Sequence, residues 1–408
     1  GTERDAQRID ASGADLRAAL YACFSSVGDS IAFEHRVYAR TAALQTLESL
    51  EDGARRRRLF MAMAPLWRAV NGAGEPASPY RRLIALEAER ARANIALAEA
   101  SIGLVPGEAE AWLVAALEAW RDNNPSHRIE PWDYRFSYAA AARALHACTP
   151  PDAVRAANDR FFADLGADLD ALGIIQDIDS RPGMAPVDYA DFARVGRVID
   201  GQWRAAIPRL SVIMQQGGLG LGAELAHENG HTVHYAGMRG RPSMLFADDM
   251  TLTLEAVADI TGWSVYEDAW QRKYLGCAAS ADDNARARLG AVMLDMAWGL
   301  FEIRMSREPG LDPNQVWTEI TSDYLRIVSH QDLSWWAVRG QLVEEPGYMI
   351  HYALGAFVTA ALRARIAAEI GDFDAGAGRD PQRRDKRNRP TQVGILLENR
   401  LFSLDASG

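Results

Sequence analysis

The chain has 408 residues, of which 48% are hydrophobic, so it can bury a large core in one large or two smaller domains. Its net charge of −11 argues against a nucleic-acid-binding protein, which would present a broad basic face. No window of about 18 apolar residues occurs, which argues against a membrane-spanning helix.

The three cysteines and the first residues bear on the compartment. Cys23, Cys148 and Cys277 are odd in number and widely spaced, which predicts free thiols in a reducing compartment. The polar start of the chain shows no signal peptide, although one removed before Gly1 stays an alternative. Arginine greatly outnumbers lysine and alanine is abundant, which suggests a GC-rich bacterial genome. We therefore expect a bacterial cytoplasmic protein.

The first third of the chain has the apolar spacing of amphipathic helices. A breaker-rich loop over 71–79 interrupts it. Helices are predicted over Ala14–Ser25, Tyr38–Leu50, Arg57–Val70, Tyr80–Ser101 and Glu108–Arg121.

A turn at 122–128 leads into an aromatic stretch over 129–138 that includes Trp132 and Tyr134. Two interpretations are equally supported by the residues. The aromatic side chains could contact a substrate beside an active site, or they could pin the start of the helix that follows.

The next segment is predicted to be helical over Pro150–Leu172, with Asp152 as N-cap, and again over Tyr189–Ala205. Arg209–Met214 is a short β-branched run closed by glycines, which predicts a strand. We expect the edge of this strand to pair with the backbone of an extended substrate.

The pattern with the clearest chemistry is His227-Glu228-Asn229-Gly230-His231. Two histidines four residues apart lie on one face of a helix, so both imidazoles can bind one cation. The glutamate after the first histidine is then placed to accept a proton from a water on that cation, as in the zincins. The pattern therefore predicts a Zn²⁺ site with His227 and His231 as ligands and Glu228 as the catalytic base.

A catalytic zinc usually takes three protein ligands. Glu255 follows His231 by 24 positions (255 − 231), which leaves room for a loop and a returning helix, and we predict it as the third ligand. Asp259 lies one turn later on the same face and is predicted to hydrogen-bond the free ring nitrogen of a ligand histidine. The alternative is that these are surface carboxylates and core histidines.

The last part is predicted to be helical over Asp282–Arg307 and Pro313–Ser329, with a cap near Asp312. Tyr348 and Tyr352 follow, one helical turn apart, so both hydroxyls can face one cavity. His330 and His351 lie near them in the sequence. Residues 371–390 are polar and are predicted to form a surface loop before a short helix over Gln392–Leu401.

His-Glu-Asn-Gly-His with the downstream Glu-Ala-Val-Ala-Asp string of 255–259 resembles the gluzincin metallopeptidases. The Glu-Ala-x-x-Asp string is similar to that of the angiotensin-converting-enzyme family. His-Glu-x-Gly-His-x-x-His, which ends at His234, is similar to the thimet-oligopeptidase family, although Asn229 departs from its usual residue. The resemblance implies a mostly α-helical, clamshell-like zincin fold with a channel over the zinc, walled partly by N-terminal helices.

Two other stretches are similar to thimet-type oligopeptidases. The segment around Trp132 and Tyr134 resembles a Trp-Asp-x-Arg-Tyr-Tyr segment, and 347–352 resembles a Gly-Tyr-x-x-x-Tyr segment whose tyrosines stabilise the oxyanion. The family carries a histidine a few residues before the first tyrosine. Val343 stands there in this chain, so that role is vacant or belongs to His330 or His351.

These observations predict a mostly α zinc metallohydrolase with a small β-sheet next to the helix of the histidine pair. We expect one catalytic domain over 1–408, with lobes over about 10–205 and 206–408. Glu228 activates the water, and Tyr348, Tyr352 or His351 stabilises the oxyanion. Trp132, Tyr134, His234 and His330 are predicted to contact a peptide or small peptide-like substrate.

Two other functions stay open. One is a gluzincin-fold zinc enzyme adapted to non-peptidase chemistry in a specialised biosynthetic pathway, with which Val343 is compatible. The other is a catalytically inactive binding protein, which the intact Glu228 disfavours. The sequence leaves the oligomeric state open and predicts neither a nucleic-acid nor a membrane partner.

Overall fold

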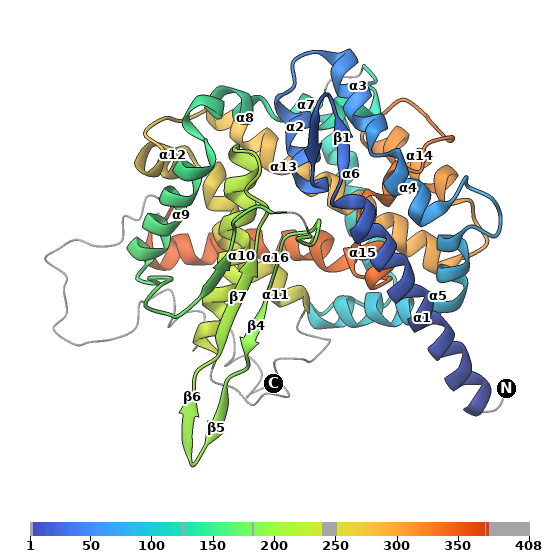
Figure 1. The fold of residues 1–408 in the computed structure, drawn as a ribbon, viewed down its shortest axis with the longest axis horizontal. Helices are drawn as coiled ribbons and strands as arrows, with labels where there is room; N and C mark the ends of the chain where they lie inside the picture. The colour runs from blue at the N-terminus through green and yellow to red at the C-terminus, as the bar shows by residue number, and fades with distance from the viewer. Residues whose placement is uncertain (1–2, 125–126, 182, 239–250, 372, 375–408) are drawn as a thin grey trace, which may run out of the picture. The chain divides into compact units, whose positions relative to one another are not determined.

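The computed structural model describes residues 3–124, 127–181, 183–238, 251–371 and 373–374. Helices dominate, and the few strands form small sheets (Figure 1). The chain divides into two compact units that alternate along the sequence. Unit 1 comprises Gly1–Ala139, Arg181–Val187 and Leu289–Ala356, and unit 2 comprises Ala140–Ser180, Asp188–Arg288 and Phe357–Gly408. The lobes expected from the sequence stay a prediction.

Unit 1 is built from amphipathic helices and one small hairpin. Its elements are α1 (Glu3–Gly28), β1 (Ile31–Phe33), β2 (Arg36–Tyr38), α2 (Arg40–Ser49), α3 (Gly53–Ala62), α4 (Ala64–Asn71), α5 (Pro79–Ser101), α6 (Glu108–Asp122), η1 (Pro131–Asp133), α7 (Tyr134–Tyr138), α14 (Pro313–Tyr324), η6 (Trp335–Val338) and α15 (Gln341–Glu344).

Unit 2 contains the three-stranded sheet and the helices packed on it. Its elements are α8 (Ala140–Leu145), η2 (His146–Cys148), α9 (Pro151–Leu165), β3 (Ile175–Asp177), β4 (Tyr189–Arg194), β5 (Arg197–Ile199), β6 (Gln202–Arg204), β7 (Ile207–Ser211), α10 (Leu219–Gly237), α11 (Thr251–Gly262), η5 (Trp263–Tyr266) and α12 (Asp268–Tyr274). Two long helices, α13 (Ala281–Arg307) and α16 (Met349–Ile370), contribute to both units, which divide after Arg288 and after Ala356.

Most predicted helices are confirmed, some with shorter bounds. The run predicted over Arg57–Val70 is two helices, α3 and α4, and the one over Pro150–Leu172 ends at Leu165. Asp312 caps α14 as expected, since its side chain accepts from the backbone N–H groups of Asn314 and Gln315. Asp152 is not an N-cap: Pro150 takes that position, and Asp152 lies in the first turn of α9. The helix predicted over Gln392–Leu401 lies outside the described residues.

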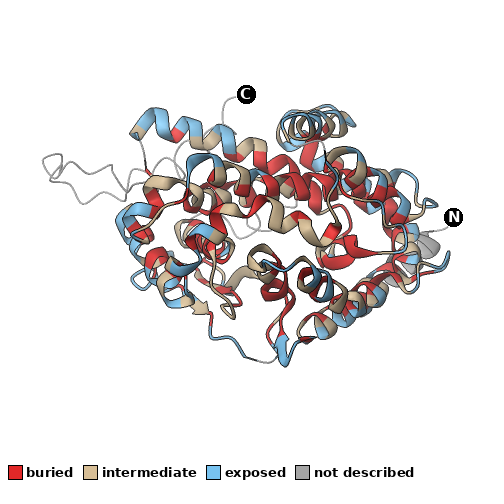
Figure 2. Cartoon of the chain, turned by 90° about the horizontal axis from the view of Figure 1, so that it is seen from above, coloured by how far each residue is buried: buried red, intermediate tan, exposed pale blue. Residues whose placement is uncertain are grey.

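Figure 2 shows buried and exposed positions alternating along the same helices, as amphipathic patterns require. In unit 1 the core holds several large aromatic side chains, including Trp298, Trp317 and Trp336, each at most 1% exposed. In unit 2, α10 and β7 share a cluster of Val154, Ile178, Leu210, Val212, Leu221 and Leu225. This cluster fixes the N-terminal half of α10 against the sheet.

The prediction of a helix over Tyr189–Ala205 is wrong. This segment forms β4 and the β5–β6 hairpin, which extends beyond β4 and β7 in Figure 1. Asp200 and Gly201 have φ of 51° and 72°, the pair of left-handed conformations that a two-residue type I′ hairpin turn requires. The Asp-Gly dipeptide was therefore a hairpin signal in the sequence.

The strand predicted over Arg209–Met214 is confirmed as β7, shifted to Ile207–Ser211, but its role as a free edge is wrong. The sheet order is β3-β7-β4, so β7 is central. It pairs in parallel with β3 and antiparallel with β4. Among the described strands, the two edges of this sheet are β3 and β4.

Two further properties concern the cysteines and the apolar character of the helices. Cys148 and Cys277 are joined by a disulfide with a Cα–Cα distance of 6.7 Å, which corrects the prediction of three free thiols, while Cys23 is free and exposed. None of the described helices combines the length and the apolar character needed to cross a membrane.

Candidate metal and catalytic site

Helix α10 carries the histidine pair. The four-residue spacing puts His227 and His231 on one face of the helix, and their Nε2 atoms lie 3.1 Å apart. His231 is 6% exposed, and the ring of Tyr235, one turn further on, stacks against it with centroids 5.8 Å apart. Tyr235 was not predicted as a site residue, although its i+4 spacing from His231 was visible in the sequence.

Helix α11 brings the predicted carboxylate to the histidines. The Oε2 atom of Glu255 lies 3.3 Å from Nε2 of His227 and 3.4 Å from Nε2 of His231. One ligand atom from each of the three residues lies within 4.8 Å of the other two, and the group could hold a metal ion. The structure therefore brings together all three predicted ligands inside unit 2.

The short distance between α10 and α11 depends on Gly230. A Cβ atom at this position would lie 2.6 Å from Oγ1 of Thr261 and 2.8 Å from the carbonyl oxygen of Ala258. Because the second of these atoms is backbone, it could yield only by moving α11. Thr261 in turn donates from Oγ1 to the carbonyl oxygen of Ala226 on α10, at 2.8 Å. The two helices thus touch at Ala258 and Thr261, within the turns next to Glu255 and Asp259.

Asp259 occupies the position predicted for it. Its Oδ1 lies 2.8 Å from Nδ1 of His227, so this ring nitrogen donates to the carboxylate and leaves Nε2 facing Glu255. Burial lowers the pKa of His227, but the hydrogen bonds with Asp259 and Glu255 outweigh it and raise that pKa well above its usual value. Burial raises the pKa of Glu255, yet its bonds to both histidines lower the pKa on balance.

Glu228 is buried beside the ligand group. It is 4% exposed, and its Oε2 atom has no hydrogen-bond partner among the described residues. Burial raises the pKa of this carboxyl well above its usual value. A carboxyl group that is costly to ionise where it lies is suited to accept a proton.

His234, predicted from the resemblance, lies on α10 in unit 2 but does not join the ligand group. It is 9% exposed, and its ring stacks against that of Tyr235 with centroids 6.3 Å apart. Burial lowers its pKa to about 4. A neutral His234 at ordinary pH is suited to packing and hydrogen bonding, and a contact with substrate stays a prediction.

The predicted tyrosines lie in unit 1, at the start of α16. The ring of Tyr348 is 5.5 Å from that of Tyr352 and 5.3 Å from that of His351, measured between centroids. The guanidinium carbon of Arg339 lies 5.2 Å from the centre of the Tyr352 ring. The three predicted residues therefore form one cluster, and their catalytic role stays a prediction.

The backbone before this cluster is held by a buried carboxylate. Glu302 on α13 accepts from the N–H of Gly347 at 2.8 Å and from the N–H of Met349 at 2.7 Å. Gly347 has φ of 89°, and a Cβ there would lie 2.7 Å from the carbonyl oxygen of Ala91. Only glycine fits this turn. Val343, which replaces the histidine of the resembling family, is fully buried.

The residues predicted around the aromatic stretch also lie in unit 1. Nε2 of His330 lies 2.7 Å from Oε2 of Glu130, and its ring is 5.6 Å from that of Trp132 between centroids. Tyr134 is 3% exposed and donates its hydroxyl to the carbonyl oxygen of Gly290. Trp132 and His330 thus form a half-buried pair, while the Tyr134 hydroxyl already has a backbone partner. A substrate role for all three stays a prediction.

The chain matches no protein-family model and no curated protein in sequence. Solved structures nevertheless share its fold. An oligoendopeptidase F superposes with a TM-score of 0.63 at 16% identity over 95% of this chain and 71% of its own. PZ peptidase A with an inhibitor gives 0.63 at 13% identity over 95% and 72%. An oligoendopeptidase F from Bacillus anthracis gives 0.54 at 12% identity over 95% and 70%.

At these identities the likeness concerns the fold. The prediction of a mostly α-helical, zincin-like fold with a small sheet beside the helix of the histidine pair is confirmed.

Proposed function

We propose that this protein is a zinc-dependent hydrolase that cleaves amide bonds in peptides or small peptide-like substrates. The proposal is carried by one observation: two histidine nitrogens and a carboxylate oxygen converge beside a buried glutamate. The fold shared with oligoendopeptidase structures supports the same reaction class.

The spacing of the three ligand atoms fits zinc. Zinc held tetrahedrally at about 2.0–2.1 Å from nitrogen and oxygen keeps neighbouring ligands about 3.3 Å apart. The three separations among His227, His231 and Glu255 are 3.1, 3.3 and 3.4 Å. Three protein ligands would leave one position for water, as in catalytic rather than structural zinc sites. The burial and charge of the group suit a divalent cation, which would neutralise Glu255.

The bound zinc would supply Lewis acidity, acidifying a water and polarising the amide carbonyl. The chain's own residues supply the rest. Asp259 fixes the ring of His227 by accepting from Nδ1. Glu228 takes the proton of the attacking water at a carboxylate oxygen and passes it to the leaving amine. Tyr348 or Tyr352 is proposed, from the sequence resemblance, as the hydroxyl donor to the oxyanion.

Strand β4 gives an extended substrate a place to bind inside unit 2. It is one of the two edge strands of the sheet among the described strands, and the ring of Phe192 on β4 lies 4.4 Å from that of Tyr235 on α10. A free edge binds the backbone of a peptide whatever its sequence. We therefore propose extended peptides, or compounds with a peptide-like backbone, as the substrate class.

The experiment is a metal analysis combined with a peptide screen on one purified sample. We expect about one zinc per chain, and turnover of library peptides that chelation abolishes and added zinc restores. Protein without zinc that still turned over peptides would refute the mechanism. Turnover confined to non-peptide amides would favour the biosynthetic alternative.

A further inference from the structure

The second half of α16 packs against α11, the helix that carries two carboxylates of the metal site. Helix α11 belongs to unit 2, and so does α16 from Phe357 onward. Ile366 of α16 packs with Ile260 of α11 in a buried cluster that also contains Phe373. The contact is therefore a buried helix–helix interface and not a surface approach.

Two polar side chains of α16 hydrogen-bond to the backbone of α11 across this interface. Thr359 donates from Oγ1 to the carbonyl oxygen of Ala256 at 3.1 Å, and Thr359 is fully buried. Arg363 donates from Nη1 to the carbonyl oxygen of Ile260. Both pairs are spaced by four residues, so one face of α16 bonds to one face of α11 at two successive turns.

The two carbonyl groups occupy particular positions in α11. Ala256 directly follows Glu255, the proposed ligand, and Ile260 directly follows Asp259, which holds His227. Helix backbone is stiff over one turn, so the two bonds fix the height and rotation of the turns that project Glu255 and Asp259.

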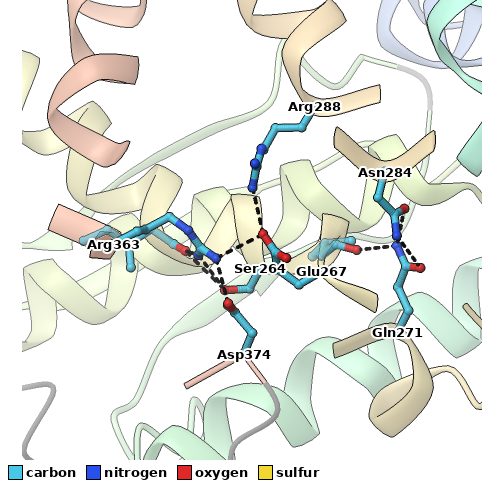
Figure 3. Close-up of polar contacts among 9 residues, drawn as sticks. Ser264, Glu267, Gln271, Asn284, Arg288, Arg363 and Asp374 are labelled. Atoms are coloured by element: carbon cyan, nitrogen blue, oxygen red, sulfur yellow. Dashed lines mark hydrogen bonds and ion pairs between the residues drawn. The ribbon is translucent and has the colours of Figure 1, made fainter. Parts of the chain in front are cut away.

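Arg363 is itself held on several sides, as Figure 3 shows. Its Nη2 lies 2.8 Å from Oδ2 of Asp374 and 3.6 Å from Oε1 of Glu267, and Nη1 donates to Oγ of Ser264 at 3.1 Å. Glu267 also binds Arg288 at 2.8 Å. Arg363 lies near the C-terminal end of α11, where the negative end of the helix dipole favours a cation.

We propose that Thr359 and Arg363 are positioning residues of the metal site, which hold α11 in the register that places Glu255 and Asp259 against the α10 histidines. This rests on the zinc site proposed above. Both residues hydrogen-bond to carbonyl groups of α11, so they act on the site through the backbone of that helix. Their loss should loosen the ligand geometry and thereby weaken zinc binding.

The test compares zinc affinity of full-length variants by competition with a chromophoric chelator. Thr359→Val keeps the shape of the side chain and removes the hydroxyl, and Arg363→Gln removes the forked cation. We expect each to raise the zinc Kd by about 10–100-fold, the range seen when groups behind metal ligands are lost. The absorption bands of the Co²⁺-substituted protein should shift as well, because they report ligand geometry independently of turnover.

Three controls separate positioning from general stability. Thr359→Ser should restore wild-type affinity, since it restores the hydroxyl. Arg365→Gln lies on the same helix, where Arg365 is exposed and pairs with Glu369 one turn away, and should bind zinc normally. The melting temperatures of the metal-free proteins measure how far each substitution destabilises the fold. If the Arg363 variant does not fold, the zinc affinity of Thr359→Val alone tests the proposal.

Wild-type zinc affinity and unchanged Co²⁺ bands in both variants would overturn the proposal, even if their melting temperatures fell. A wild-type protein that bound no zinc would instead refute the proposed function, and this inference with it.

Discussion

Oδ1 of Asp259 lies 2.8 Å from Nδ1 of His227, while Oε2 of Glu255, one turn earlier on α11, lies 3.3 Å from Nε2 of the same ring. Two carboxylates of α11 therefore contact the two ring nitrogens of His227. The first carboxylate sets the tautomer and the ring plane, and in the proposed metal site the second would share the cation with Nε2. Metal binding at this site would thus depend on how accurately α11 lies along α10.

The first prediction concerns the ligands. His231→Ala leaves one histidine and Glu255, and two remaining ligands hold zinc poorly. We expect the purified variant to have lost its zinc by metal analysis. His146→Ala is the control, because His146 is exposed in unit 2 and is not one of the three grouped residues, and it should keep one zinc. Full zinc in the His231 variant would contradict the ligand assignment.

The second prediction concerns the base. Glu228→Gln should keep zinc and fold but lose about 10²–10⁴-fold in turnover, because an amide does not accept the proton of the water. Glu89→Gln is the control, because Glu89 is exposed on α5 in unit 1, and its kcat should be near that of the wild type. Near wild-type turnover by the Glu228 variant would remove the base role.

The third prediction tests the closeness of α10 and α11 with two glycines of one helix. Gly230→Ala places a Cβ against the backbone of Ala258 and should force the helices apart. We expect zinc affinity to fall by about tenfold or more, since sites tolerate only about 0.5 Å of displacement. Gly222→Ala should be nearly neutral, because its nearest new contact is 3.4 Å from the side chain of Val265. Equal zinc affinities, measured by chelator competition, would show that Gly230 is not needed.

The fourth prediction concerns the tyrosines. An oxyanion donor acts mainly in the transition state, so its loss lowers kcat with little change in KM. We expect Tyr348→Phe or Tyr352→Phe to reduce kcat by about 10²–10³-fold, and by no less than about tenfold, with zinc content and melting temperature nearly unchanged. Tyr352 is slightly favoured as the donor, because it is a residue of the regular helix α16, whereas Tyr348 precedes that helix. If steady-state kinetics found both variants fully active, the role would move to His351, His330 or the zinc alone.

The fifth prediction concerns Glu302. Burial raises its pKa to about 8 from 4.5, although the N–H groups of Gly347 and Met349 lower it. Between about pH 4.5 and pH 8 the folded protein therefore keeps a proton that the unfolded chain has already released. The contribution of this residue to stability falls as the pH rises through that window. In Glu302→Gln this dependence is lost.

The measurement is the melting temperature of both proteins from about pH 5 to pH 8. The advantage of the wild type over Glu302→Gln should be largest at the acidic end and shrink toward the alkaline end. Glu308→Gln, an exposed glutamate just past the end of α13, should follow the wild-type profile. A difference that grows with pH would mean that the backbone hydrogen bonds, and not burial, dominate the pKa of Glu302.

The sequence by itself determined the local features of this protein. The His227–His231 face, the neighbouring Glu228 and most helices follow from a period of 3.6 residues, which depends only on neighbours along the chain. Glu255 and Asp259 share a face for the same reason. The helix predicted over Tyr189–Ala205 is wrong because Asp200-Gly201 forms a tight hairpin turn, a signal that is also local.

Only the tertiary structure decided which segments meet. The 24-residue interval between His231 and Glu255 is compatible with many returns of the chain, and the observed one depends on contacts between Gly230, Thr261 and Ala258. The central place of β7 and the bond between Cys148 and Cys277, 129 residues apart, likewise have no local signal. Nothing in the local sequence distinguishes Arg363 from an arginine on a helix surface. Its bond to α11 depends on how α16 packs on that helix, and packing between distant segments depends on the whole fold.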